Sequence, residues 1–381
     1  MLPTLLVISS LVLFALLPTL YIRYVLFRQE KSRWRWLCWA PLAVFLLTSV
    51  LLIPFVYCAG LMHFFAFLVT CVLMPMFVFA LVSAIGWCLG RKWPKVQRKV
   101  TFLGLGNGIA VFLLAFYGIF FGWRELEVKQ VDIYIEDLPE AFDGYRIAHL
   151  TDLHVGAYGD NTAFVERVVN ETNALQADMI VFTGDLININ AWELTPFENT
   201  LAQLKAKDGV FAVLGNHDYC RYGFDKSGDE QKLACEAVQA TERRMGWHLL
   251  MDEHTFVYRN GDSIAVAGVG NIGKHYRYGD LNKALDGLSD SVFTMLLSHD
   301  PNHWCMEVLN HPSVGLTLSG HTHAAQVRIG KWSPAAMSFR EWSGLYESGQ
   351  QNLYVSEGLG GTFPFRLGAT PQIVLITLHR K

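Results

Sequence analysis

The chain has 381 residues, of which 52% are apolar and only 17% are charged, whereas about a quarter of an average soluble chain is charged. This composition excludes a disordered protein and a protein that coats nucleic acid. The net charge of −3 is the sum of two opposite parts. Residues 1–124 carry eleven bases and one acid, a charge of +10, and residues 125–381 carry twenty bases and thirty-three acids, a charge of −13. We therefore expect two domains, 1–124 and 125–381.

Four apolar stretches in the first domain are long enough to cross a bilayer, which takes about 20 residues. None contains an acid, and they are Leu2–Leu26, Leu37–Tyr57, Leu61–Leu89 and Val100–Trp123. Four runs of this length are typical of a membrane protein and rare among the buried helices of a soluble one. The sequence predicts an integral membrane protein with four spans, in which a four-helix transmembrane bundle anchors the rest of the chain in a lipid bilayer.

The linkers between the apolar stretches predict the orientation. Arg28–Trp36 and Arg91–Lys99 contain clustered bases, whereas Cys58–Gly60 contains none. Basic loops stay on the cytoplasmic side of a membrane. The residues that follow the fourth stretch should therefore lie on the non-cytoplasmic side of the membrane. We accordingly expect the second domain to be extracytoplasmic.

From residue 125 onward, short apolar runs alternate with amphipathic stretches, as in layered α/β domains. The runs predicted to be strands are Arg146–Leu150, Met179–Thr183, Val210–Leu214, Ile264–Val269, Thr294–Leu297, Gly315–Leu318, Leu353–Val355 and Gln372–Leu378. The predicted helices are Asn161–Gln176, Glu198–Lys205 and Glu230–Met245.

Five of these strands are followed at once by side chains that bind metals. The side chains, in strand order, are Asp152 and His154, then Asp185, then Asn216, His217 and Asp218, then His299 and Asp300, and last His321 and His323. One such fragment occurs by chance, but five at the carboxyl ends of strands, where α/β sheets place their sites, do not. The set lacks thiolates, which disfavours structural zinc, and it is large enough for two ions of Mn, Fe or Zn. Two such ions about 3.5–4 Å apart activate water and clamp a phosphate.

The motifs HLTDLHVG, VFTGDLIN, VLGNHD, LLSHDP and LSGHTHAAQ, in this order, resemble those of the calcineurin-like metallophosphoesterases. The resemblance covers about Tyr145–Leu378, and together with the late VSEGLGG run it is closest to the membrane-anchored, YkuE-like branch. It implies a four-layer αββα sandwich of two facing sheets, with a dinuclear metal site at one sheet edge.

The resemblance also implies a role for each motif residue. The ligands of one ion would be Asp152, His154 and His323, those of the other Asn216, His299 and His321, and Asp185 would bridge the two. His217 would act at the leaving-group oxygen, as an acid or an electrostatic stabiliser, and Asp218 would orient it. The nucleophile would be a hydroxide that bridges the ions, and Mn is the favoured metal.

One departure from the family pattern lies beside the last ligand. Where the family often has Gly-Gly-Gln, this chain has Ala324, Ala325 and Gln326. We expect the two extra methyl groups to narrow the access of substrate without affecting metal binding.

The cysteines leave one question open. Cys220 and Cys235 lie close together in the sequence, and in an extracytoplasmic domain they could form a disulfide.

The predicted function is hydrolysis of a phosphodiester, phosphomonoester or pyrophosphate bond. The anchor favours a lipid-linked or envelope phosphate ester as the substrate. One alternative is a pyrophosphatase for UDP-linked acylated sugars of lipid A type synthesis, which related enzymes perform; the predicted orientation counts against it because these nucleotide sugars are cytoplasmic. Another is a non-catalytic receptor or assembly module for a phosphate ligand, and the complete ligand set counts against that. We expect no nucleic-acid partner, and the oligomeric state stays open.

Overall fold

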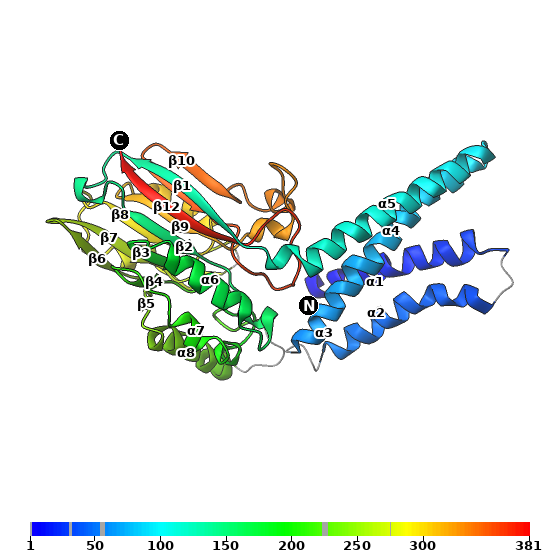
Figure 1. Cartoon of the computed structure of the whole chain (residues 1–381), viewed down its shortest axis with the longest axis horizontal. Helices are drawn as coiled ribbons and strands as arrows, with labels where there is room; N and C mark the ends of the chain where they lie inside the picture. The colour runs from blue at the N-terminus through cyan, green and yellow to red at the C-terminus, as the bar shows by residue number, and fades with distance from the viewer. Residues whose placement is uncertain (1, 30–32, 54–57, 223–227, 275) are drawn as a thin grey trace. The chain divides into compact units, whose positions relative to one another are not determined.

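The computed structural model describes residues 2–29, 33–53, 58–222, 228–274 and 276–381. They form two compact units (Figure 1). The helical unit comprises Met1–Gly122 and Phe363–Leu367, and the sheet unit comprises Trp123–Thr362 and Gly368–Lys381.

The described part of the helical unit contains α1 Leu2–Tyr21, α2 Ala40–Leu51, α3 Ala59–Phe67, α4 Met74–Gly90 and α5 Pro94–Phe120. A turn of π-helix, Leu68–Leu73, joins α3 to α4, and a second, Ile22–Leu26, extends α1. The helix α5 begins six residues before the predicted span Val100–Trp123, because Pro94 is well suited to the first turn of a helix. The predicted basic linker therefore becomes largely helical.

Two helical segments are long and apolar enough to cross a membrane, Ala59–Gly90 and Pro94–Arg124. Only 28% of the most apolar stretch of each is buried. The core helix of a soluble protein buries its apolar surface, so these exposed ones are typical of helices that face lipid. Val12–Leu26 and Arg35–Leu51 are apolar but shorter, and residues 54–57, which end the predicted second span, lie outside the described residues. The four-span bundle therefore stays a prediction.

Glycines allow α4 and α5 to pack closely. The α-carbon of Gly104 faces the backbone at Phe79 and Ser83, and that of Gly108 faces the backbone at Pro75. A side chain at either glycine would push the helices apart, which is why small residues mark such contacts between apolar helices.

The segment Phe363–Leu367, which the sequence assigns to the second domain, packs in the helical unit. Phe365 lies against Ala115 and Ile119 of α5, and the N–H of Arg366 donates to the carbonyl of Gly118 at 3.2 Å. Gly118 has no side chain in the way, so the segment can approach the helix backbone.

The sheet unit contains two six-stranded sheets (Figure 1). The first has the order β1-β12-β2-β3-β4-β5 and the second β10-β11-β9-β8-β7-β6. The strands are β1 Glu127–Ile135, β2 Arg146–Leu150, β3 Met179–Phe182, β4 Val210–Ala212, β5 His248–Leu249, β6 Glu253–Arg259, β7 Asp262–Gly268, β8 Thr294–Leu297, β9 Val314–Ser319, β10 Gly344–Ser348, β11 Gln351–Val355 and β12 Gln372–Arg380. Strands β2 to β5 are parallel to one another, as are β7, β8, β9 and β11.

Three apolar clusters lie between the layers of helices and sheets in this unit. One lies between the sheets and joins Ile147 and Met179 to Val266 and Leu316. The outer face of the first sheet packs on a helix layer, α6 Ala163–Ala174, α7 Glu198–Leu201 and α8 Gly228–Arg244. The outer face of the second sheet packs on α9 Leu281–Leu285 and α10 Asn302–Met306. The predicted mixed α/β architecture is therefore present, and its parallel strands end at one edge of each sheet.

The cysteines are all free thiols, Cys220 and Cys235 included. The candidate disulfide is absent from the structure, where Cys220 is buried in the apolar cluster beneath α8.

Candidate metal centre

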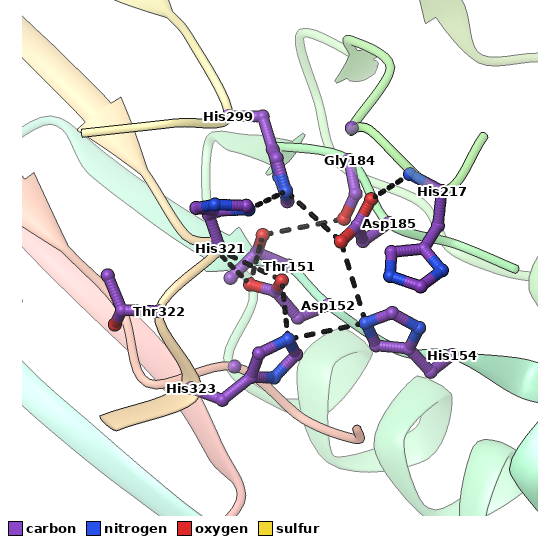
Figure 2. Close-up of polar contacts among 12 residues, drawn as sticks. Thr151, Asp152, His154, Gly184, Asp185, His217, His299, His321, Thr322 and His323 are labelled. Carbon is purple, nitrogen blue, oxygen red and sulfur yellow. Dashed lines mark hydrogen bonds and ion pairs between the residues drawn. The ribbon is translucent and has the colours of Figure 1, made fainter. Parts of the chain in front are cut away.

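The loops that follow four strands bring six of the predicted ligands to one place (Figure 2). Asp152 and His154 follow β2, Asp185 follows β3, His299 follows β8, and His321 and His323 follow β9. We call these six residues the Asp/His cluster. All but His299 have a positive φ, a backbone conformation that costs energy outside glycine and that concentrates at functional sites. The loops are therefore held in the shape that points these side chains inward.

The cluster contains two groups of possible metal ligands. In the first group, Asp152, His154, Asp185 and His323 each offer an atom within 4.8 Å of the others. Nε2 of His154 lies 3.3 Å from Nε2 of His323, which lies 3.3 Å from Oδ1 of Asp152. Ligand atoms bound at about 2.0–2.2 Å lie about 3.0–3.4 Å apart around one ion. These separations match those of atoms that could share a cation.

The second group contains Asp185, His299 and His321. Nε2 of His299 lies 3.1 Å from Oδ2 of Asp185, and Nδ1 of His321 lies 3.1 Å from Nε2 of His299. The same Oδ2 atom of Asp185 lies 3.5 Å from Nε2 of His154 in the first group. Asp185 is the one residue common to both groups.

The protonation of the cluster fits a cation site. Burial lowers the pKa of His154 to about 3 and that of His321 to about 4, so both imidazoles are neutral and offer lone pairs. Burial acts in the same sense on His299, but the carboxylates of Asp185 and Asp152 outweigh it and raise its pKa to about 10. Burial also raises the pKa of Asp152 to about 7. The buried carboxylates thus attract positive charge, which divalent ions would supply.

Asn216 presents the remaining predicted ligand atom. Its side chain is 6% exposed, and its Nδ2 donates to the hydroxyl of Tyr222 at 2.9 Å. Its Oδ1 is buried and has no hydrogen-bond partner within the described residues. A buried amide oxygen without a partner is costly, and a metal ion would satisfy it.

Backbone carbonyls fix the rings of two other histidines. Nδ1 of His299 donates to the carbonyl of Thr183 at 2.7 Å, which leaves Nε2 as its ligand atom. Nδ1 of half-buried His217 donates to the carbonyl of Asn188 at 2.6 Å, which leaves Nε2 for another partner. The ring of His217 also stacks on Tyr222, with centroids 4.3 Å apart.

The contacts of Asp218 are with backbone groups of two loops. Its buried carboxylate accepts hydrogen bonds from four backbone N–H groups, those of Asp185, Leu186, Ile187 and Gly215. The orienting contact to His217 comes instead from the carbonyl of Asn188. Asp218 therefore joins the loop after β3 to the loop after β4 through hydrogen bonds to their backbone.

Four contacts of the centre were not predicted from the sequence. Tyr222 orients Asn216, and Oδ2 of Asp300 lies 3.7 Å from Nε2 of His321. The carbonyls of Thr183 and Asn188 hold histidine rings. Asp300 is among the polar residues that follow the predicted strands, but its contact with His321 was not predicted, and a backbone carbonyl leaves no signal because every residue has one.

The Ala-Ala departure has a conformational consequence. His323, Ala324, Ala325 and Gln326 all have φ between 48° and 59°. Ala324 is fully buried and Ala325 is exposed, so only the methyl group of Ala325 can meet a substrate. The alanines therefore strain the backbone, and the narrowing of substrate access by the methyl group of Ala325 stays a prediction.

We expect Ala325→Gly to stabilise the protein by about 0.5–1 kcal/mol. Relief of the left-handed strain, roughly 1–2 kcal/mol, exceeds the entropy cost of a glycine. The matched control is Ala336→Gly, which is also exposed but has an ordinary φ, and which should destabilise the protein by about 0.5–1 kcal/mol. Thermal unfolding in detergent measures both. Equal destabilisation by the two substitutions would refute the strain.

Comparisons with known proteins agree with this geometry. The family model described as calcineurin-like phosphoesterase matches residues 145–325. A transmembrane protein with metallophosphoesterase domain from Bos taurus is 31% identical, over 77% of this chain and 67% of its own length. The metallophosphoesterase YkuE of Bacillus subtilis is 29% identical, over 74% of this chain and 98% of its own length. The UDP-2,3-diacylglucosamine pyrophosphatase LpxG of Chlamydia muridarum is 27% identical, over 63% of this chain and 86% of its own length.

Proposed function

Because the chain belongs to the calcineurin-like phosphoesterase family, we propose that it is a membrane-anchored enzyme that uses two divalent metal ions to hydrolyse a phosphodiester, phosphomonoester or pyrophosphate bond. The favoured substrate is a lipid-linked or envelope phosphate ester. One observation carries the dinuclear part of the proposal: Oδ2 of Asp185 lies between the two ligand groups, 3.5 Å from His154 and 3.1 Å from His299.

Each residue of the centre has a proposed part. Asp152, His154 and His323 would hold one ion, His299, His321 and Asn216 would hold the other, and Asp185, which belongs to both groups, would serve both. When bound, two divalent ions supply Lewis acidity and lower the pKa of water, and Mn²⁺ is the favoured metal. Nε2 of His217, which the contact of Nδ1 with the carbonyl of Asn188 leaves available, acts at the leaving-group oxygen, as an acid in the imidazolium form or as an electrostatic stabiliser. Asp218 keeps the loops of Asp185 and His217 in register.

The proposed membrane anchor is residues 1–124. Its support is the pair of long apolar helices that leave most of their surface uncovered. The name of the bovine relative, a transmembrane protein with metallophosphoesterase domain, points the same way. We propose that the four apolar stretches all span the bilayer and that the sheet unit is extracytoplasmic.

A second candidate substrate comes from one relative. LpxG is named a UDP-2,3-diacylglucosamine pyrophosphatase, so at least one related enzyme is named for cleaving a diphosphate that carries acyl chains. Both candidates share a phosphate attached to a lipid. The side of the membrane on which the sheet unit lies separates the two candidates. A reporter that is active only outside the cytoplasm is fused after Lys381. An active reporter would favour the envelope substrate, and an inactive one would favour the cytoplasmic nucleotide sugar.

The direct test is a substrate panel with the full chain in detergent and Mn²⁺. It should contain bis-p-nitrophenyl phosphate, p-nitrophenyl phosphate, UDP-diacylglucosamine and a lipid phosphate in mixed micelles. We expect metal-dependent hydrolysis, with the lipid-bearing substrates preferred over the soluble ones. Absence of hydrolysis across the panel, with both ions bound, would refute the proposed function.

A further inference from the structure

The chain after the last cluster residue forms an ordered segment with exposed apolar side chains. The segment, Val327–Trp342, begins four residues after His323. Ile329 and Trp332 pair through two backbone hydrogen bonds across the turn at Gly330 and Lys331. A 3₁₀ turn, Pro334–Met337, follows. The side chains of Ile329, Trp332 and Met337 are 66%, 50% and 84% exposed.

Buried contacts hold the segment in place. The hydroxyl of Ser333, which is fully buried, donates to the carbonyl of Ala324, and the hydroxyl of Thr322 donates to the carbonyl of Trp342 at 2.7 Å. The ring of Phe339 meets the ring of His321 edge to face, with centroids 5.4 Å apart. The exposed apolar residues therefore do not belong to a loose loop, and both ends of the segment are fixed beside the Asp/His cluster.

The exposed charges around the apolar residues are positive. The exposed bases are Lys331 and Arg340 on the segment and Lys274, whose Nζ donates to the carbonyl of Ser338 at 3.2 Å; Arg328 is half-buried and pairs with Glu357. The acids that pair with two of them, Glu341 and Glu357, are buried, whereas the side chain of Arg340 is 88% exposed. A basic surface is unusual in this part of the chain, because residues 125–381 carry a charge of −13.

We infer that Val327–Trp342 is a lipid-contact segment that rests on an anionic bilayer surface. Trp, Ile and Met beside Lys and Arg are the residues that bind at the boundary of headgroups and acyl chains. Anionic headgroups attract juxtamembrane bases by about 1 kcal/mol each. The surface is complementary to anionic lipid in both respects, because its apolar side chains match the acyl boundary and its bases match the anionic headgroups. The contact is a second attachment, distinct from the helices of residues 1–124, and it brings a phosphate at the membrane surface to the cluster.

The first arm of the test measures depth and needs no turnover. Met337→Cys is labelled with an environment-sensitive fluorophore in full-length protein whose exposed Cys58, Cys88 and Cys305 are replaced by serine. The protein is placed in nanodiscs that contain phosphatidylglycerol and a spin-labelled quencher lipid. The matched position is Tyr258→Cys, which is 74% exposed on β6. We expect quenching at 337, stronger than in discs of phosphatidylcholine alone, and little at 258. Equal quenching at the two positions would overturn the inference.

The second arm rests on the proposed function. Trp332→Ser and Met337→Ser should raise KM for a lipid phosphate in anionic vesicles by about tenfold each, the size expected when one apolar side chain stays in water. Both should leave hydrolysis of water-soluble p-nitrophenyl phosphate unchanged. Leu233→Ser, 65% exposed on α8, should change neither. An unchanged KM in anionic vesicles would refute the lipid contact. If the substitutions instead changed only the oligomeric mass, the segment would bind a second copy of the chain and not lipid. If the wild type hydrolyses neither substrate, the proposed function fails and the quenching result decides the lipid contact alone.

Discussion

Asp185→Asn will reduce phosphoester hydrolysis by about a thousandfold or more while the sheet unit stays folded. Asp185 is the one residue common to both ligand groups, so its carboxylate is the charge that a second ion depends on most. Asparagine has the same shape, and its Oδ1 can still accept the N–H of His217, a bond of 2.8 Å in the wild type. The loss should therefore be chemical, at a site where metal ions provide most of the activation of water.

Two measurements check this expectation. Metal analysis of the purified variant should show at most one ion per chain, and thermal unfolding with excess Mn²⁺ should show a folded protein. The matched control is Asp132→Asn, an exposed carboxylate on β1 that pairs with His379 at 2.9 Å, and it should retain full turnover. Near-wild-type turnover of Asp185→Asn would show that the bridging role is wrong.

His217→Ala will reduce turnover by about 10²–10⁴-fold, the usual contribution of a general acid or base, and it will leave both ions bound. The reason is that Nε2 of His217 is not used by the backbone, while its ring lies against His154 with centroids 4.7 Å apart. A proton at this atom helps most when the leaving group is poor. The loss should therefore be large for a lipid phosphate and much smaller for p-nitrophenyl phosphate.

This dependence on leaving group separates proton donation from a structural role. A variant that merely disturbs the centre would lose the same factor on every substrate and would lose metal as well. Such a uniform loss would refute the role of His217. Retention of two ions with a leaving-group-dependent loss would support it.

The sequence predicted the centre better than the edges of the fold. The strands that carry the cluster are buried on both faces, so they are continuous apolar runs, and β2 and β8 match their predicted bounds. The edge strand β1 was missed because one face is exposed, and its alternation of polar and apolar residues gives a weak signal. The edge strands β6 and β10 were missed for the same reason, and β5 has only two residues.

The remaining differences depend on contacts that no local pattern records. The placement of Phe363–Leu367 in the helical unit depends on the bare backbone of Gly118, far away in the sequence. The role of Asp218 depends on four backbone groups, and the strain at Ala324 and Ala325 depends on φ. The spacing of residues in the sequence can identify such positions as candidates, but it does not predict which atoms their side chains contact.

The most direct test of the dinuclear centre is to measure metal content and turnover in the same sample during titration with Mn²⁺. The protein is first stripped with a chelator, and Mn²⁺ is then added in steps with the preferred substrate of the panel. We predict that turnover is absent without metal and reaches its maximum only at two ions per chain, and that Asp185→Asn never reaches that maximum. Full turnover in the stripped protein, or a maximum at one ion per chain, would contradict the two-metal centre.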